Sequence, residues 1–553
     1  MKLRVLFFST LVFPLALVAG GGQYSQAPTD SASEFPHLRR QGTAAQLIVD
    51  GKPFLVLSGE LGNNSGTSLE YMKSVWPKLV EAKINTVMTG VSWAQIEPEE
   101  GKFDFRIVDG MIQEARSHNL RWVPLWFASW KNSLSSYPPV WVKKDFERFP
   151  RAQTAGGKSI ELLSPLSDAN RDADARAFAA LMRHIKEVDS QQHTVIMVQL
   201  ENEVGMHGDS RDRSPAANQA FAGPAPQELM DYLQQHKDTL IPEFRRVWEA
   251  AGFKTSGTWE EVFGQSRVTD GIFMAWHYAR YISRVAGAGK AECPVPMFVN
   301  AALYGIGGGS QPASGGRPWD LVMDVWKAGG PQIDMLSPDS YGERDFAAFC
   351  AKFDQPGNPL FVPENMGGVD GAARVLYILG RHNAIGWTVM GITDPKLPHP
   401  DTNLIASFDL IYQLAPLISA HQGDGTMSAV LLRSANDPPQ KFQLGNYTME
   451  ASFYSPPKMT GVPPPPQPPP PAAAIFIATG PDEFYVAGLG IKVTFSPNTP
   501  GPPLAGLASV EEGTFVNGRW VAGRSLAGDD SDEGQSLMLD WKGIQHFTLY
   551  RYR

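Results

Sequence analysis

The feature of this 553-residue sequence that most restricts its fold is a repeated alternation of short apolar stretches with amphipathic helical stretches. The alternation runs from about residue 44 to residue 422. Between the apolar stretches, apolar residues recur every three to four positions, as in the segment from Leu69 to Ala82. Eight such stretches predict strands at 54–60, 85–93, 122–127, 194–203, 295–300, 333–338, 359–364 and 384–390. Eight strands that alternate with helices predict an α/β fold, a (β/α)8 TIM barrel with loop insertions.

A Rossmann-like open sheet is the competing arrangement for such a pattern. It requires a glycine-rich turn that opens a helix directly after the first strand, and this sequence has none there. The glycines from Gly305 to Gly309 follow the fifth strand and no phosphate-binding lysine accompanies them. We therefore interpret residues 44–422 as a barrel, with a long excursion at 206–268.

The sequence changes character after Gln422. Short apolar stretches separated by Pro, Gly and Asn replace the helical pattern, which predicts a C-terminal all-β, sandwich-like domain over residues 423–553. Within it, residues 456–471 are proline-rich and are expected to form an extended, solvent-exposed loop. A stiff surface loop is the preferred interpretation, and a proline-binding partner is the alternative.

The N-terminus has the pattern of a signal peptide, predicted at residues 1–21. Lys2 and Arg4 precede an apolar run, and small residues follow it. The chain is therefore expected to be exported to the periplasm or the extracellular space, with a linker at 22–43. No later run reaches ~20 apolar residues, so stable membrane insertion is not expected. Cys293 and Cys350 could form a disulfide in such a compartment, but a chain of this size does not need one.

Composition restricts the kind of ligand. The net charge of −9 is spread along the chain, which disfavours a nucleic-acid partner. The sequence has no metal-ligand cluster, and His277 is expected to be a structural helix histidine, so neither a metal nor a cofactor is predicted. The 14 Trp and 29 Phe favour a carbohydrate ligand, because sugar rings stack on aromatic faces.

Two carboxylates stand at predicted strand ends where a barrel places its active site. Glu203 ends the fourth strand after Asn202, and Glu364 ends the seventh. Retaining glycosidases use two such groups about 5–5.5 Å apart, one as nucleophile and one as acid/base. The alternation of a strand would put Glu201 and Glu203 on one face and Asn202 on the other. Both Asn202 and Glu203 can therefore point into the site only if the strand end is irregular.

With these residues the sequence resembles the clan A retaining glycosidases, and within them glycoside hydrolase family 35, the β-galactosidases. The resemblance covers roughly residues 44–420. The motifs that carry it are Gly51–Phe54 with Leu57–Glu60, Asn85–Val87, Trp93 with Glu97–Phe105, and Gln199–Gly205. The segment Phe484–Gly490 is similar to the C-terminal domain of a bacterial subset that includes enzymes removing β-galactose from xyloglucan side chains.

The resemblance implies a retaining exo-β-galactosidase that hydrolyses terminal β-galactosides by double displacement. It implies that Glu203 is the acid/base, Glu364 the nucleophile, and Asn202 the ligand of the sugar 2-hydroxyl. Tyr341, just after the sixth strand, would orient Glu364. The implied partner is an oligosaccharide or polysaccharide with terminal β-galactose, and no cofactor is implied.

Two positions depart from the family. Many members have a Tyr on the second strand where this chain has Gly90, and an Asn-Ala-Glu-Trp run where it has Phe127–Trp130, with Ser129 in place of Glu. Those positions contact galactose in the relatives. The substitutes expected here, together with other strand-end residues predicted to line the subsite, are Trp126, Trp130, Lys131, Glu60, Trp93, Asn300 and Trp387.

Other functions stay open at this point. One is a different clan A retaining β-glycosidase or an endo-glycanase, which would have an open groove rather than a closed pocket. A non-catalytic carbohydrate-binding barrel is the alternative from another class, disfavoured because both carboxylates and Asn202 are present. A metal-dependent barrel hydrolase is disfavoured because the strand ends carry no His-rich set. The natural substrate, the linkage and the oligomeric state are left open.

Overall fold

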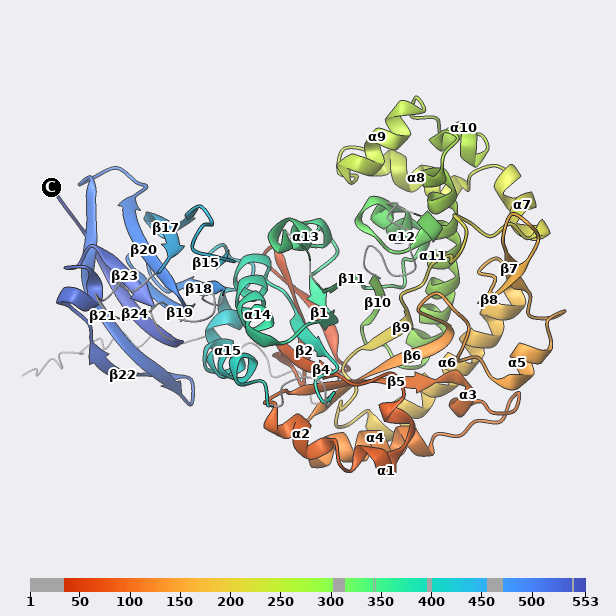
Figure 1. Cartoon of the computed structure of the whole chain (residues 1–553), viewed down its shortest axis with the longest axis horizontal. Coiled ribbons are helices and arrows are strands. Elements are labelled where there is room, and N and C mark those ends of the chain that lie inside the picture. The colour runs from red at the N-terminus through yellow and green to blue at the C-terminus, as the bar shows by residue number, and fades with distance from the viewer. Residues whose placement is uncertain are drawn as a thin grey trace, which may run out of the picture.

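A computed structural model describes residues 34–301, 314–341, 343, 345–394, 400–454, 471–539 and 542–553. The predicted signal peptide, the first part of the predicted linker, the Gly305–Gly309 run and all but the last residue of the proline-rich loop lie outside these residues. The chain forms an elongated molecule with a barrel and its surrounding helices at one end and a β-domain at the other (Figure 1).

The eight predicted strands are present and form a closed parallel barrel. Its sheet has the strand order β12-β14-β4-β5-β6-β9-β10-β11-β13. β12 and β13 are two halves of the seventh strand, separated by Pro363, which has no N–H to donate to a neighbour. β12 pairs with β14 and β13 pairs with β11, so the two halves close the circle. The strands are β4 (Val56–Glu60), β5 (Thr86–Ser92), β6 (Arg121–Lys131), β9 (Val198–Asn202), β10 (Met297–Ala301), β11 (Met335–Ser340), β12 (Phe361–Val362), β13 (Glu364–Asn365) and β14 (Gly386–Met390).

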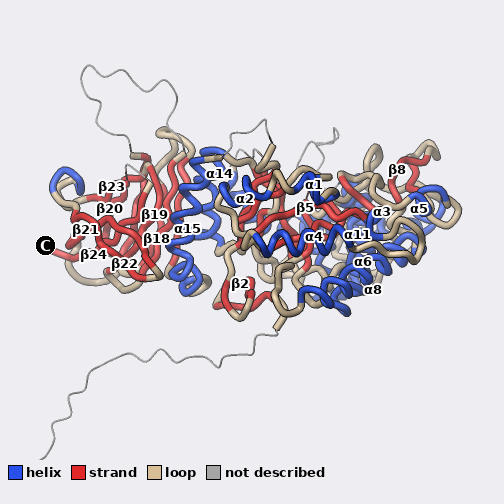
Figure 2. The backbone as a smooth tube through the Cα atoms, turned by 90° about the horizontal axis from the view of Figure 1, so that it is seen from below, coloured by secondary structure: helices blue, strands red, loops and turns tan. Residues whose placement is uncertain are grey.

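Helices surround the barrel on its outer face (Figures 1 and 2). The segment predicted as one helix from Leu69 to Ala82 is two helices, because Pro77 cannot donate the hydrogen bond that would continue the first into the second. The helices up to the fourth strand are α1 (Leu69–Met72), α2 (Trp76–Glu81), α3 (Trp93–Ile96), α4 (Arg106–Ser117), α5 (Val140–Lys144) and α6 (Asp168–Asp189). A short hairpin, β7 (Arg151–Gln153) with β8 (Ser159–Leu163), precedes α6.

The long excursion after the fourth strand is helical. It contains α7 (Pro215–Ala222), α8 (Gln227–Gln235), α9 (Pro242–Ala250) and α10 (Trp259–Phe263). In Figure 1, α8 to α10 lie together at the top of the view and α7 lies at the upper right. The helices that follow are α11 (Arg267–Glu292), α12 (Met323–Gly329), α13 (Phe346–Phe353), α14 (Gly368–His382) and α15 (Thr402–His421).

The barrel interior is a packed core closed at one end by a small sheet. Inward side chains from six of the strands form one buried cluster: Val56, Met88, Val123, Leu125, Phe127, Phe298, Met335 and Phe361. Leu47 and Val49 of β2 (Ala44–Val49) belong to the same cluster. β2 pairs with β1 (His37–Gln41) and β3 (Lys52–Pro53), so residues 37–41 form a strand where the sequence predicted a linker. That part of the linker assignment is corrected, because β1 supplies the edge pairing of β2.

The C-terminal domain is a sandwich of two antiparallel sheets, as predicted. One has the order β15-β18-β19-β24-β21-β22 and the other β16-β17-β20-β23. The strands are β15 (Met427–Leu432), β16 (Gln440–Leu444), β17 (Tyr447–Phe453), β18 (Ala472–Ala478), β19 (Glu483–Leu489), β20 (Ile491–Pro497), β21 (Leu504–Val516), β22 (Arg519–Ser525), β23 (Ser536–Leu539) and β24 (Gly543–Tyr552).

In the six-stranded sheet, the strands β15 and β18 are buried on both faces. Along β18, Ala474 and Phe476 pack in the sandwich core, whereas Ile475 and Ile477 belong to the core of the barrel and its helices. This strict alternation explains why the strand reads as a continuous apolar run. Figure 2 shows α14 and α15 between the barrel and this sheet. The two domains therefore share one continuous apolar interface.

Among the described helices, α15 is the one whose length and mean hydropathy would suit a membrane span. Its apolar residues Leu404, Phe408 and Ile411 are buried in the core, so its composition is explained by its place between the two domains. Cys293 and Cys350 are both buried and unpaired.

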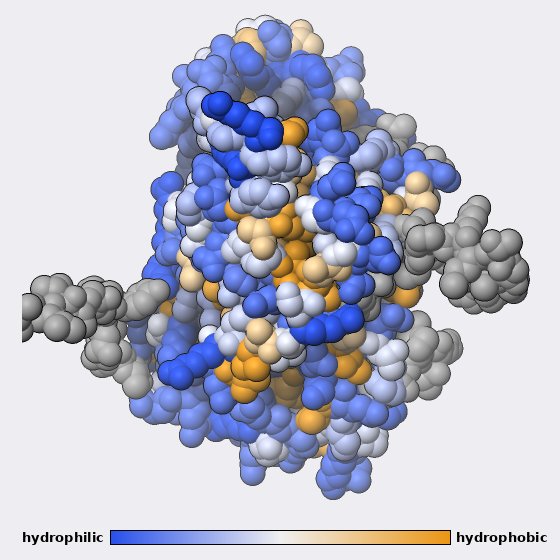
Figure 3. Space-filling model, turned by 90° about the vertical axis from the view of Figure 1, so that its left-hand side faces the viewer, coloured by the Kyte–Doolittle hydropathy of each residue, from blue (hydrophilic) through white to orange (hydrophobic). Residues whose placement is uncertain are grey.

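The far end of the sandwich is mainly hydrophilic, with a narrow band of apolar surface near its centre (Figure 3). The large apolar side chains that this domain exposes are scattered over β21, β22 and β24: Leu504, Val516, Val521, Tyr550 and Tyr552.

Candidate active site

The end of β9 is irregular. This was expected, because a regular strand cannot direct both Asn202 and Glu203 into the site. Trp126 of β6 pairs with Leu200, but the next partner of β9 on that strand is Lys131, opposite Asn202. β6 therefore bulges outward over the intervening residues. The carboxylate of Glu201 fills this bulge, where it accepts hydrogen bonds from the backbone N–H groups of Ser129 (3.2 Å) and Trp130 (2.7 Å).

Two left-handed residues redirect the strand end. Glu201 has φ 58° and Glu203 has φ 45°, a conformation that costs a non-glycine residue of order 1–3 kcal/mol. The turn at Glu201 sends its own side chain into the wall, while Asn202 and Glu203 both enter the barrel mouth. Asn300 of β10 holds this arrangement, because its Oδ1 accepts the backbone N–H of Glu203 at 2.9 Å.

Glu364 lies opposite and its carboxylate is held by three donors. Oε1 accepts hydrogen bonds from Nδ2 of Asn202 (3.2 Å) and Nδ2 of Asn300 (3.0 Å), and Oε2 accepts from the hydroxyl of Tyr341 (2.5 Å). Oxygens of Glu203 and Glu364 lie within 4.8 Å of each other. The two predicted carboxylates, Asn202, Asn300 and Tyr341 are thus brought together as expected.

The two carboxyl groups have different surroundings. Burial and the nearby charge of Glu364 raise the pKa of Glu203 to about 7, against the opposing influence of Lys131 and Arg317. Glu203 is therefore protonated below neutral pH while Glu364 accepts hydrogen bonds only. An acid and a hydrogen-bonded carboxylate that face each other are the two groups that glycoside hydrolysis needs.

Glu60 and Lys131 complete the charged wall of the site. Nζ of Lys131 donates to Oδ1 of Asn202 at 2.7 Å and stands 5.1 Å from the centre of the Phe127 ring. Glu60 is fully buried, and neither of its carboxylate oxygens has a hydrogen-bond partner among the residues that the structure describes. Burial and Glu364 raise its pKa well above the usual range. A ligand with many hydroxyl groups could donate the hydrogen bonds that these buried oxygens at the barrel mouth lack.

Four tryptophans predicted to line the subsite do not lie in it. Trp126 and Trp130 point outward into the helix layer, where Nε1 of Trp126 donates to Asp174 (2.9 Å) and Nε1 of Trp130 to the carbonyl of Leu163 (3.0 Å). These assignments are corrected, because strand alternation and the bulge give the inward positions to Phe127 and Lys131.

Trp93 and Trp387 are corrected for a similar reason. Trp93 begins α3 and donates to Oε2 of Glu97 (2.8 Å), so this pair braces the following loop. Trp387 occupies an outward position on β14 and its ring packs edge-on against Phe346 of α13. The two inward residues of the same strand end are Thr388 and Met390.

The structure explains the two positions, Gly90 and Ser129, at which this chain departs from family 35. A Cβ atom at Gly90 would lie 2.6 Å from the carbonyl oxygen of Asn63 and 2.7 Å from the Phe127 ring, so no tyrosine fits there. Ser129 points away from the site and its hydroxyl bonds with Asp174 and Tyr281, both at 2.7 Å. Neither position offers a sugar contact in this chain.

Two residues of the site were missed by the sequence analysis. Asp339 faces inward on β11, and its carboxylate lies within 4.8 Å of those of Glu203 and Glu364. In a strand that begins at Met335, every second residue faces inward, so Asp339 would have been predicted to face the site. The strand predicted from the sequence, however, ended at Pro338. Arg317 is buried close to Glu203, and the absence of a side chain on Gly205 gives it room, since a Cβ there would stand 2.5 Å from its Cγ. No local pattern marks Arg317.

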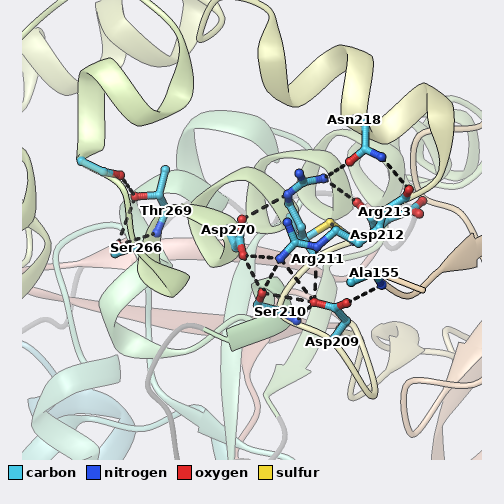
Figure 4. A network of polar contacts seen from close by, with 12 residues as sticks. Ala155, Asp209, Ser210, Arg211, Asp212, Arg213, Asn218, Ser266, Thr269 and Asp270 are labelled. Atoms are coloured by element: carbon cyan, nitrogen blue, oxygen red, sulfur yellow. Dashed lines mark hydrogen bonds and ion pairs between the residues drawn. The ribbon is translucent and has the colours of Figure 1, made fainter. Parts of the chain in front are cut away.

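A network of ion pairs fixes the loop that leaves the site after Glu203. Arg211 and Arg213 both pair with Asp270 of α11, at 3.1 and 2.8 Å, and Asp209 accepts the backbone N–H of Ala155 at 2.9 Å (Figure 4). Asn218 of α7 joins the same network through Arg211. The loop is thereby tied to the β7–β8 hairpin and the longest helix.

Comparisons with known proteins match two separate parts of the chain. Residues 67–270 match the model of the family described as Beta-galactosidase, glycoside hydrolase family 42, which belongs to clan A. Residues 404–538 match a Domain of unknown function (DUF5597). A Beta-galactosidase of Xanthomonas manihotis is 28% identical over 207 residues, which cover 36% of this chain and 31% of that protein. The matched part thus spans less than a third of the curated relative.

Similar solved structures include the catalytic domain of beta-amylase from Paenibacillus polymyxa, with 13% identity and a TM-score of 0.44, covering 63% of this chain and 96% of that one. The cold-adapted beta-galactosidase from Rahnella sp. R3 has 14% identity and a TM-score of 0.44, covering 69% of this chain and 58% of that one.

Proposed function

We propose that this protein is a glycoside hydrolase, a β-galactosidase that acts with retention of configuration. The observation that carries the proposal is the pairing of Glu203 and Glu364 within 4.8 Å at the C-terminal mouth of the barrel. An approach of two carboxylate oxygens within 4.8 Å is compatible with the ~5–5.5 Å separation of the carboxyl groups in retaining enzymes. The family match over residues 67–270 supports the galactosidase class.

In the first step, a carboxylate oxygen of Glu364 attacks the anomeric carbon while the protonated carboxyl of Glu203 gives its proton to the departing glycosidic oxygen. The bond from the anomeric carbon to the leaving group breaks and a glycosyl ester forms on Glu364. In the second step, Glu203, now a carboxylate, takes a proton from water, which attacks the anomeric carbon and releases Glu364. The raised pKa of Glu203 suits it to both roles.

Finer assignments rest on the motifs rather than on the comparisons. The resemblance to family 35 and to xyloglucan-active enzymes leads us to propose an exo-acting enzyme on terminal β-galactosides of plant cell-wall side chains, in an exported protein. Lys131 and Glu60, whose two carboxylate oxygens have no partner in the described part of the chain, are the groups proposed to bind sugar hydroxyls. Asn202, next to both, is proposed to bind the 2-hydroxyl.

The test is hydrolysis of 4-nitrophenyl β-D-galactoside with the product anomer followed by NMR. The first-formed sugar should be β-galactose, the retained anomer. Azide should rescue Glu364→Ala as α-galactosyl azide and Glu203→Ala as β-galactosyl azide, because azide replaces the nucleophile in one case and water in the other. First-formed α-galactose would overturn retention.

A panel of other 4-nitrophenyl β-glycosides and soluble β-glycans separates the alternatives. Cleavage of another glycoside but not the galactoside would keep the acid/base pair and remove the galactose assignment. Binding of galactosides without any cleavage would favour the non-catalytic carbohydrate-binding barrel.

A further inference from the structure

Asp339 lies within 4.8 Å of both reacting carboxyl groups, and nothing in the proposed double displacement uses it. It is 1% exposed and projects inward from β11. Nδ2 of Asn300 donates to its Oδ2 at 3.0 Å, and the same Nδ2 donates to Glu364 at 3.0 Å. One amide therefore fixes Asp339 and the nucleophile together.

The other oxygen of Asp339 has no donor. Oδ1 is buried and without a hydrogen-bond partner among the described residues, although a carboxylate oxygen of Asp339 lies within 4.8 Å of one of Glu203. Two carboxylates cannot bond to each other, because both only accept. The contact becomes a hydrogen bond when one of the two groups carries a proton.

The surrounding charges decide which group keeps that proton. Asp339 is faced by Glu364, Glu203 and Glu60 from the ends of three other strands, by Lys131 from β6 and by the hydroxyl of Tyr341 just after its own strand, with Arg317 close to Glu203. Burial, followed by the three carboxylates, raises the pKa of Asp339 well above its usual range. The positive charge of Lys131 lowers the pKa of Asp339, but the Lys131 ammonium group already donates hydrogen bonds to Asn202 and Asn132.

A divalent cation is the other species that three clustered carboxylates could share. The contacts disfavour it here. Asn202, Asn300 and Tyr341 donate to Glu364 and so use three of the about four acceptor positions of its carboxylate, which leaves little room for a metal ion. Lys131 and Arg317 also bring positive charge to the same site.

We propose that Asp339 is a positioning residue that stays protonated and donates a hydrogen bond to Glu203, so that it sets the proton affinity of the acid/base. It keeps its own proton through both steps. When Glu203 has protonated the leaving group, the hydrogen bond from Asp339 stabilises the new Glu203 carboxylate. When Glu203 takes a proton from water, this hydrogen bond weakens again. The inference rests on the proposed glycosidase function.

Two variants separate a protonated Asp339 from a charged one. Asp339→Asn keeps a neutral donor to Glu203, so the alkaline limb of kcat/KM should stay within about 0.3 pH units of the wild type. Asp339→Ala removes the donor, so the limb should move up by about one pH unit and kcat/KM should fall about tenfold. A downward shift of about one unit in Asp339→Asn would overturn the proposal, because it would show that a negative charge had been removed.

A purely structural role predicts a different result. Both variants would then lose activity and thermal stability in parallel, with the alkaline limb unmoved in Asp339→Ala. Loss of wild-type activity on adding EDTA, restored by Mg²⁺ or Ca²⁺, would instead assign the cluster to a cation and also overturn the proposal.

A readout that needs no substrate keeps this inference separate from the proposed function. The infrared difference spectrum of wild type minus Asp339→Asn at neutral pH should contain the C=O stretch of a protonated carboxylic acid. If this band is present but the protein cleaves no glycoside, the proposal of a protonated Asp339 stands and the proposed glycosidase function is rejected. Its absence in an active enzyme would reject the protonated Asp339 alone.

Discussion

At the end of β9, the carboxyl group of Glu201 lies in the barrel wall and that of Glu203 lies in the barrel mouth. The two environments differ in how many of their buried carboxylate oxygens have hydrogen-bond partners. Glu201, in the wall, accepts hydrogen bonds from two backbone N–H groups and lies close to Asp174. Asp174 in turn accepts from Trp126 and Ser129. On the other side, the cluster around Glu203 includes Glu60 and an oxygen of Asp339 that have no partners among the described residues.

Both groups of carboxyls are buried and both have raised pKa values, chiefly through burial. A raised pKa therefore does not by itself distinguish a functional carboxyl from a structural one. Unsatisfied hydrogen-bonding atoms do, because a folded protein tolerates them mainly where a ligand will supply the partner. We expect substitutions in the wall to reduce stability and substitutions in the mouth to reduce activity.

The largest effect is expected for Glu201→Ala. It leaves the N–H groups of Ser129 and Trp130 buried without acceptors and opens a cavity in the bulge, so the free energy of unfolding should fall by about 3–5 kcal/mol. Denaturant unfolding measures this. Glu70→Ala, an exposed residue of α1, is the control and should change stability by less than about 0.5 kcal/mol. An unchanged unfolding midpoint in Glu201→Ala would remove the distinction between wall and mouth.

The opposite pattern is expected for Glu60→Gln. The side chain of Glu60 makes no hydrogen bond in the described structure, so the free energy of unfolding should stay the same or rise by about 1 kcal/mol. Loss of a carboxyl group that binds a sugar hydroxyl should lower kcat/KM about 10- to 100-fold. Steady-state kinetics with thermal unfolding of the same preparations would show it. A stability loss as large as that of Glu201→Ala would assign Glu60 to the structural group.

The pH dependence of kcat/KM should reflect the mouth and not the wall. Glu203 must be protonated to act as the acid, and its pKa is raised to about 7. Activity should therefore be retained below that value and fall about tenfold per pH unit above it. A matched profile for Glu203→Gln, on a substrate whose leaving group needs no protonation, should lack this limb. A limb that persists in that variant would belong to another group.

The smallest effect on catalysis is expected for Trp126→Phe. Trp126 faces the helices, so the change should cost about 1 kcal/mol of stability through the lost bond to Asp174 and leave KM within about twofold. Lys131→Met, on the same strand but facing Asn202, should raise KM or lower kcat at least about tenfold. A large rise of KM in Trp126→Phe would instead support the prediction from the sequence that Trp126 contacts the sugar.

Much of the architecture could be predicted from local sequence. The eight strands, the helices between them and the sandwich after residue 422 each follow from a period of two or of 3.6 in the apolar residues. Glu203 and Glu364 were identifiable for the same reason, because any inward polar residue at the C-terminal end of a barrel strand reaches the mouth.

The orientation of individual side chains at the strand ends depended on contacts that no single segment contains. The bulge in β6 exists because Glu201, more than 70 residues later in the chain, supplies acceptors for its N–H groups. That bulge turns Trp130 outward and Lys131 inward, and it allows Asn202 and Glu203 to share one side of the strand. Local periodicity assigns a face to each residue only while the ladder stays regular.

The sequence by itself therefore determined the barrel, the sandwich and the two opposed carboxyl groups. The tertiary structure alone decided that the tryptophans belong to the wall, that Arg317 approaches Glu203 through the space at Gly205, and that Asp339 completes the cluster. The physical reason is that strand formation is a local property of side-chain pattern, whereas the protonation and direction of buried charges depend on neighbours that only the closed barrel brings together.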